Sequence, residues 1–147
     1  MPHVRESIRS NATTAVTSLS TTGSRVYRSR VYPLAHGKLP GLCVYCEGES
    51  TQTDTMGASS TLDRELDLMV EAYVRGTANY DNTLDDICAE VEAGLAADMT
   101  RGGFAKDCYL TRTEFEFSDE GDQPIAMARL TFRIIYRTTK ASATSAV

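Results

Sequence analysis

Residues 62–75 carry a nearly strict alternation of apolar and charged side chains, and this pattern constrains the chain more than any other. The apolar set is Leu62, Leu66, Leu68, Val70, Ala72 and Val74, and the charged set is Asp63, Glu65, Asp67, Glu71 and Arg75. Successive side chains of a strand point to opposite faces, so the pattern predicts one long, half-buried strand. Strands ordinarily run about 5–6 residues. We therefore expect this strand to extend beyond its own core and to require a partner or a second copy along its surplus edge.

Size and charge narrow the possible functions. A chain of 147 residues fits one domain, and its net charge of −5 argues against a protein that grips nucleic-acid phosphates with Lys and Arg. An acidic surface is better suited to a conduit through which DNA passes without binding. No window is apolar over the roughly 20 residues that a membrane span needs. Residues 1–6 lack the apolar core of a secretory signal, which favours a cytoplasmic protein.

The chain offers little for catalysis. Cys43 and Cys46 have the spacing of a redox pair, but at i and i+3 of a strand their side chains face opposite ways, so we expect free thiols. The two histidines, His3 and His36, lie in no context that exposes a nucleophile. We expect no enzyme, no metal and no cofactor. The acidic residues between 81 and 92 do not have the spacing of a calcium-binding loop and are interpreted as the solvent-exposed side of a helix.

The periodicities predict an α+β fold: a two-layer α/β sandwich, a mostly antiparallel sheet with two helices packed on one face. The expected helices are residues 3–19 and 81–98, and the expected strands are residues 25–32, 42–47 (a central strand), 62–75, 107–118 and 125–138. Residues 48–60 are polar and predict a mobile loop or the tip of a long hairpin. The domain is expected to end at residue 138, with 139–147 as a disordered tail.

Two of the strands have expected core faces. In 125–138 that face holds Ala128, Leu130, Phe132, Ile134 and Tyr136. In 107–118, Tyr109, Thr111, Thr113, Phe115 and Phe117 alternate and are expected to share a face. The stripe of residues 84, 87, 88, 91 and 95 is the expected buried side of the second helix.

The chain resembles the tail terminator proteins of long-tailed bacteriophages, the lambda minor tail protein U type. The resemblance begins with the helix-opening run His-Val-Arg-Glu-Ser-Ile-Arg of residues 3–9. It continues through Arg-Val-Tyr-Arg-Ser-Arg-Val-Tyr-Pro-Leu at 25–34 and Leu-Pro-Gly-Leu-Cys-Val-Tyr at 39–45. It closes with Leu-Thr-Phe-Arg-Ile-Ile-Tyr-Arg at 130–137, so it covers about residues 3–138 in order.

The resemblance implies a structural virion protein of the tail neck. Such proteins form a homohexameric ring on the head-proximal end of the tail tube, stop tube polymerisation and present a surface to the head connector. Expected partners are copies of the chain, the tube protein, a head-side connector or stopper, and genomic DNA that slides through the lumen. The residues expected to make the contacts are Arg28, Arg30, Glu49, Thr51, Asp54 and Met56.

Two other functions stay open at this point. One is a head-side neck protein, a stopper or head–tail joining protein, which binding to the tube protein or to the head connector would distinguish. The other is a small thiol oxidoreductase that uses Cys43 and Cys46, whose activity a Cys43→Ser variant would abolish.

Overall fold

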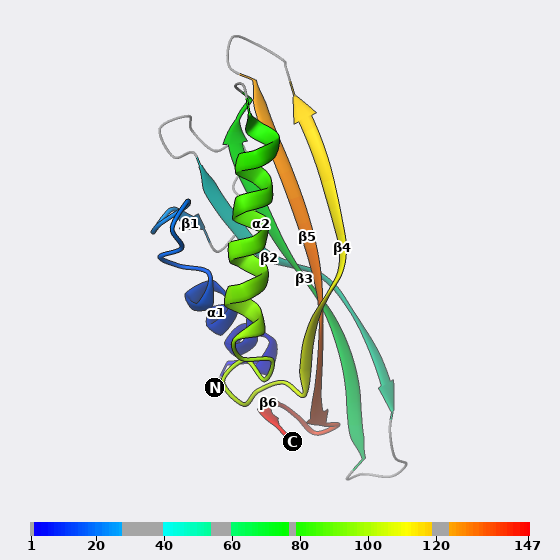
Figure 1. Cartoon of the computed structure of the whole chain (residues 1–147). Coiled ribbons are helices and arrows are strands. Elements are labelled where there is room, and N and C mark those ends of the chain that lie inside the picture. The colour runs from blue at the N-terminus through cyan, green and yellow to red at the C-terminus, as the bar shows by residue number, and fades with distance from the viewer. Residues whose placement is uncertain (1, 28–39, 54–59, 77–78, 119–123) are drawn as a thin grey trace.

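The part of the chain that the structure describes forms a six-stranded sheet with two helices on one face, which confirms the predicted α+β class. The computed structural model describes residues 2–27, 40–53, 60–76, 79–118 and 124–147. The elements in chain order are α1 (Val4–Ala15), β1 (Val26–Tyr27), β2 (Gly41–Thr53), β3 (Thr61–Arg75), α2 (Tyr80–Ala96), β4 (Asp107–Ser118), β5 (Ile125–Thr139) and β6 (Ser142–Ala146) (Figure 1).

The sheet is built around two long central strands. The strand order is β1-β2-β3-β5-β4, with β6 also paired to β5. β1 runs parallel to β2, and every other pair is antiparallel. β3 and β5 stay in one register from Thr61 opposite Thr139 to Arg75 opposite Ile125. The long strand predicted at 62–75 is therefore confirmed as β3, and strands 107–118 and 125–138 are confirmed as a hairpin.

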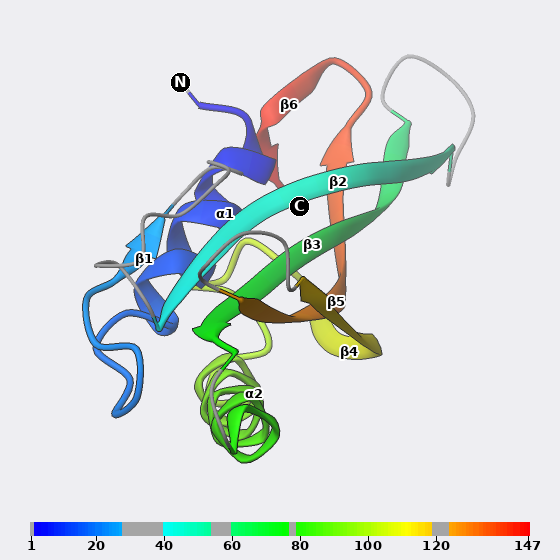
Figure 2. The same cartoon turned by 90° about the horizontal axis from the view of Figure 1, so that it is seen from above.

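The hydrophobic core lies between the sheet and the helices (Figure 2). The apolar face of β3 and the predicted core face of β5 both point into this layer. The buried stripe of α2 is also confirmed: Leu84, Ile87, Cys88, Val91 and Leu95. The apolar face of the strands packs against the apolar stripe of the helix, because each of these faces must be covered.

The first helix is shorter than predicted. α1 ends at Ala15 instead of near residue 19. Thr13 and Thr17 each donate a hydroxyl hydrogen bond to the carbonyl four residues earlier, at 2.8 and 2.7 Å. Such bonds and the low helix propensity of threonine weaken the last turn. Ser18 then adopts a left-handed backbone with φ of 67°, which cannot continue the helix.

β2 is longer than predicted. It runs through Thr53, so residues 48–53, expected in a mobile loop or at the tip of a long hairpin, pair with residues 62–67 of β3. A run of polar residues has no apolar alternation by which a strand could be predicted from the sequence. The backbone hydrogen bonds with β3 nevertheless hold these residues in a strand. On its other side, β2 pairs with β1 at Leu42 and Cys43.

A bulge in β4 overturns the predicted shared face. The register with β5 shifts between Leu110 and Arg112, so Thr111 is the extra residue. Tyr109 lies opposite Arg133, whereas Phe115 and Phe117 lie opposite Ala128 and Ala126, which face the helices. Beyond the bulge, Phe115 and Phe117 therefore lie on the opposite face of the sheet from Tyr109.

The C-terminal residues are ordered, against the prediction of a disordered tail at 139–147. Ser142–Ala146 form β6, and Ala146 packs against the main core. The amide of Val147 donates to the carbonyl of Arg137 at 2.9 Å. Small residues can turn tightly onto the end of β5, where the ladder offers free backbone partners. The strand predicted at 25–32 is seen only as β1; its residues 28–32, the loop at 34–39 and the turn at 119–122 lie outside the described residues.

Candidate interaction surfaces

The far ends of β2 and β3, residues 48–53 and 61–67, form an arm that extends past the helices (Figure 1). Thr51, Gln52 and Thr53 are exposed. The arm is nevertheless continuous with the sheet, because β3 pairs with β5 along its whole length. A strand pair held in this way is a rigid projection and not a loop.

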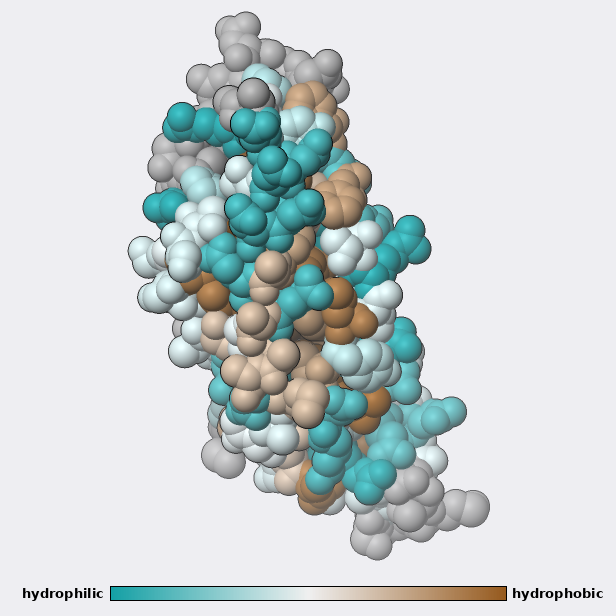
Figure 3. Space-filling view, viewed as in Figure 1, coloured by the Kyte–Doolittle hydropathy of each residue, from teal (hydrophilic) through white to brown (hydrophobic). Residues whose placement is uncertain are grey.

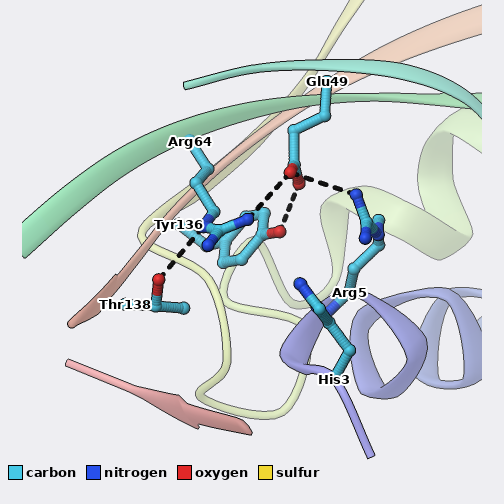
Figure 4. Close-up of polar contacts among 6 residues, drawn as sticks. All are labelled: His3, Arg5, Glu49, Arg64, Tyr136 and Thr138. Atoms are coloured by element: carbon cyan, nitrogen blue, oxygen red, sulfur yellow. Dashed lines mark hydrogen bonds and ion pairs between the residues drawn. The ribbon is translucent and has the colours of Figure 1, made fainter. Parts of the chain in front are cut away.

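A buried polar cluster joins the arm to the rest of the protein (Figure 4). Glu49 of β2 accepts hydrogen bonds from Arg64 of β3 and Arg5 of α1, both at 3.1 Å, and from the hydroxyl of Tyr136 of β5. Arg64 also donates to Thr138 at 3.0 Å, and its guanidinium lies 5.8 Å from the centre of the Tyr136 ring. Four elements of the chain therefore meet at one carboxylate.

The cluster is sheltered from solvent, which strengthens its interactions. The Glu49 side chain is only 8% exposed and that of Arg64 13%. Burial, and then the hydrogen bond to Glu49, raise the pKa of Tyr136 well above its usual value, so its hydroxyl stays a donor. A hydrogen-bonded charge in a low-dielectric site is costly to leave without its partner.

His3 begins α1 beside this cluster and makes stability depend on pH. Its Nδ1 accepts from the amide of Arg5 at 3.0 Å, which requires a neutral ring. Burial and then the Arg5 guanidinium lower the pKa of His3. The unfolded chain, with a His pKa of about 6.5, therefore takes up the proton first. The free energy that this cap adds to the native state is complete above that value and is lost as pH falls below it.

We expect His3→Asn to remove this pH dependence. Asparagine keeps an N-cap acceptor but does not titrate. Between pH 7.5 and 5.5 the wild-type melting temperature should fall further than that of the variant, by the equivalent of about 1 kcal/mol or less. Thermal unfolding at both pH values measures the difference, and parallel behaviour of the two proteins would contradict it.

The helix-free face of the sheet carries a row of ion pairs between β3 and β5. Asp63 lies opposite Arg137, Asp67 opposite Arg133 and Glu71 opposite Arg129. The shortest contacts are 2.6 Å for the first pair and 2.8 Å for the last. The arginines of β5 on this face thus all have acidic partners, and the face is close to neutral.

Glu71 differs from the other acids of this row because it is fully buried. Its side chain is 0% exposed, and it also accepts a hydrogen bond from the Tyr73 hydroxyl at 2.9 Å. Cys43, Tyr73 and Met127 form a second, small apolar cluster on this face. The strong hydrogen bond to Glu71 raises the pKa of Arg129 far above its ordinary value.

The flank of the sheet beside β4 is apolar and uncovered. Phe115 is 59% exposed and Phe117 48% exposed, and both lie on the helix side of the sheet. Figure 3 shows apolar side chains gathered on this flank, to the right of α2. The Phe117 ring contacts Tyr80 at the start of α2, with centroids 5.1 Å apart. Exposed aromatic side chains on an edge strand are typical of interaction sites.

The structure separates the residues predicted to make contacts. Glu49 was expected on a loop but is buried in the polar cluster, which is a structural position. Thr51 is exposed on the arm, opposite Arg64. Arg28, Arg30, Asp54 and Met56 lie outside the described residues. Sequence reasoning missed Arg5, Arg64 and Tyr136 as partners of Glu49. Arg64 did carry a signal, because it interrupts the apolar side of the alternation between Leu62 and Leu66.

The two cysteines with redox spacing are not arranged as a pair. Cys43 belongs to the cluster on the helix-free face, whereas Cys46 packs against the core on the helix side. Burial raises the pKa of Cys46, which disfavours the reactive thiolate. Burial also raises the pKa of Cys88, to about 11. Cys43, Cys46, Cys88 and Cys108 are all free thiols, as predicted.

Two negative findings concern the described residues only. Within them, His, Cys, Asp and Glu nowhere gather in a group of three that could bind a metal. In the same part of the chain, neither helix is long and apolar enough to cross a membrane.

Comparison with known proteins gives matches among solved structures only. No family model and no curated protein matches the sequence. Among solved structures, a chain of the virion of a native gene transfer agent particle is similar, with a TM-score of 0.44 and 16% sequence identity. The likeness covers 90% of this chain and 92% of that one. At this TM-score the likeness carries no argument about function.

Proposed function

We propose that this chain is a non-enzymatic structural protein of a phage virion, a tail terminator that assembles as a homohexameric ring. The ring would sit on the head-proximal end of the tail tube, end its polymerisation and present a surface for the head. The observation that carries the proposal is the exposed aromatic edge of β4, with Phe115 and Phe117. Among the described strands, β4 pairs only with β5.

An exposed aromatic edge of this kind is suited to bind a different surface of the next copy, in a head-to-tail contact. Such a heterologous contact builds a ring when the rotation between copies closes. The arm supports the same proposal, because an ordered projection gives a ring an axial contact with the next layer of an assembly. The paired charges of the helix-free face are compatible with DNA that passes without binding, since phosphate binding needs unpaired Lys and Arg.

Adding the protein to growing tail tubes tests this proposal. Purified tube protein should polymerise without limit when alone. With this protein added, tubes should stop growing and carry a ring of six copies at one end. Electron microscopy measures both the tube lengths and the end density, and an unrelated acidic protein of similar size is the control. Unchanged lengths with bare tube ends would contradict the proposal, as would binding to the head connector without binding to the tube.

A further inference from the structure

We propose that a groove between α2 and the start of β4 binds a basic amphipathic helix of another protein. The groove has a volume of about 250 Å³, and its lining includes Met99 after α2, Leu110 of β4 and Phe132 of β5. Leu110 belongs to the first part of β4, away from Phe115 and Phe117, which the proposed ring contact uses. The inference therefore goes beyond the ring and does not depend on it.

The helices cover the sheet unevenly, which leaves room for this partner. α1 packs beside β2, whereas α2 packs over β3 and β5 (Figure 2). Among the described residues, no third helix lies beyond α2 to cover β4. Cys108 and Leu110 nevertheless lie on the helix side of the sheet, because they pair with Ile134 and Phe132 of the core face of β5. A helix placed about 8–10 Å from α2 would complete this layer.

The groove exposes apolar side chains above a rigid base. Met99 is 54% exposed and Tyr109 41%, and both line the groove. Leu95 and Phe132 of the same lining belong to the main core, so the packing of α2 against the sheet holds the floor in place. Exposed apolar side chains that gather in this way mark interaction sites. The flexible thioether of Met99 can adapt to the side chain that a partner inserts.

The charge beside the groove favours a basic partner. Among the described residues of its lining, Glu92 carries the only charge. Asp85 lies on the same side of α2, because both carboxylates act on Cys88 and add to the larger effect of burial in raising its pKa. Residues 80–98 hold further acidic side chains at 81, 86, 90 and 98 and contain no Lys or Arg. A Lys or Arg of a bound helix would therefore meet carboxylates.

Two cations of this chain follow α2 but do not line the groove. Arg101 acts on the pKa of Cys108, yet its side chain is buried and donates to backbone carbonyls at the end of α2. Lys106 precedes β4 and is not among the described lining residues. Within the described part of the chain, neither Asp85 nor Glu92 forms an ion pair. Both carboxylates are thus available to a partner.

The spacing of these two carboxylates defines the helix that fits. Asp85 and Glu92 are seven residues apart in the sequence, which is about 10 Å along α2. A helix that lies beside α2 would meet both with Lys or Arg residues that are also seven positions apart. Its apolar side chains, spaced i, i+4 and i+7 as in other helices bound in grooves, would then face Met99 and Leu110.

A synthetic helix tests the site on the full-length protein. The probe is a fluorescent peptide with Leu at i, i+4 and i+7, Lys on both sides of this stripe and Ala elsewhere. Fluorescence anisotropy should show saturable binding, which Glu92→Lys and Met99→Ser each weaken at least about tenfold, as at interface hot spots. Asp86→Lys is the matched control. It makes the same change of charge at an exposed position of α2 outside the lining, and it should leave the affinity almost unchanged.

The methyl group of Met99 gives a second readout at the site itself. Its NMR resonance should shift when the peptide is added. The resonances of Met69 and Met127 should not, because Met69 is buried and Met127 belongs to the small cluster on the helix-free face.

Three results would overturn this inference. Equal weakening by Glu92→Lys and Asp86→Lys, or equal binding of a peptide with its Leu residues replaced by Ser, would show charge attraction without docking. Absence of peptide binding would overturn it as well, and self-association that Met99→Ser abolishes would then assign the groove to a second copy. The terminator proposal is tested by tube length and ring formation, so it stands or falls independently of these results.

Discussion

Glu71→Ala should lower the free energy of unfolding by about 3 kcal/mol, the low end of the cost of breaking a buried ion pair. The substitution leaves Arg129 without its 2.8 Å partner and the Tyr73 hydroxyl without its acceptor. Glu114, at 3.9 Å from Arg129, compensates only in part. Urea unfolding should show a lower midpoint with an unchanged slope.

Glu65→Ala is the matched control for Glu71. Glu65 lies on the same strand and the same face, but its side chain is 52% exposed and 3.9 Å from Arg133. Exposed pairs of this kind contribute about 0–1 kcal/mol. Equal losses in the two variants would mean that the burial of Glu71 has no energetic consequence.

Glu49→Ala should be similarly damaging, at about 3 kcal/mol, and its effect should concentrate on the arm. The change removes the one acceptor shared by Arg64, Arg5 and Tyr136. The Tyr136 hydroxyl and the Nη1 of Arg64 would then lose their shared acceptor, although Arg64 keeps its bond to Thr138. Hydrogen exchange should accelerate at the amides of residues 48–53 and 61–67 more than in α2, because Glu49 and Arg64 belong to the arm.

Tyr136→Phe separates the contribution of the Tyr136 hydrogen bond from that of the charged arginines. It removes one donor to Glu49 and leaves both arginines in place, so the loss should be about 1 kcal/mol. Arg5→Ala should cost still less, because that side chain is 37% exposed. A Glu49→Ala variant with unchanged exchange in the arm would contradict a role for the cluster in holding the arm.

Long periodic segments were predictable from the sequence, and the reason is physical. β3, β5 and α2 each bury a continuous apolar face, so their patterns record their environment directly. The polar half of β2 was not predictable in this way. Residues 48–53 are held by backbone pairing with β3 and by Glu49, and neither leaves an apolar period.

The wrongly predicted face of β4 and the contacts that were not predicted have the same cause. Both depend on pairing between residues that are far apart in the sequence. The extra residue Thr111 inverts the alternation of β4, and nothing in its own sequence marks it. β6 forms because the end of β5 offers free backbone groups, which a local reading of small residues cannot see. Of the predicted contact residues, Glu49 was expected on a loop but is buried, because Arg64 and Tyr136 donate hydrogen bonds to its carboxylate in the folded protein.

The uneven distribution of bulges has a consequence for how this protein can change length. β2 and β4 each already accommodate one extra residue, at Glu47 and Thr111, whereas β3 and β5 have none. An insertion in β2 or β4 can shift an existing irregularity. One inside β3 or β5 would exchange the two faces, bringing Glu71 into the helix layer and Val70 out of it. Related chains should therefore vary in length at the outer strands and keep the central pair at a fixed number of residues.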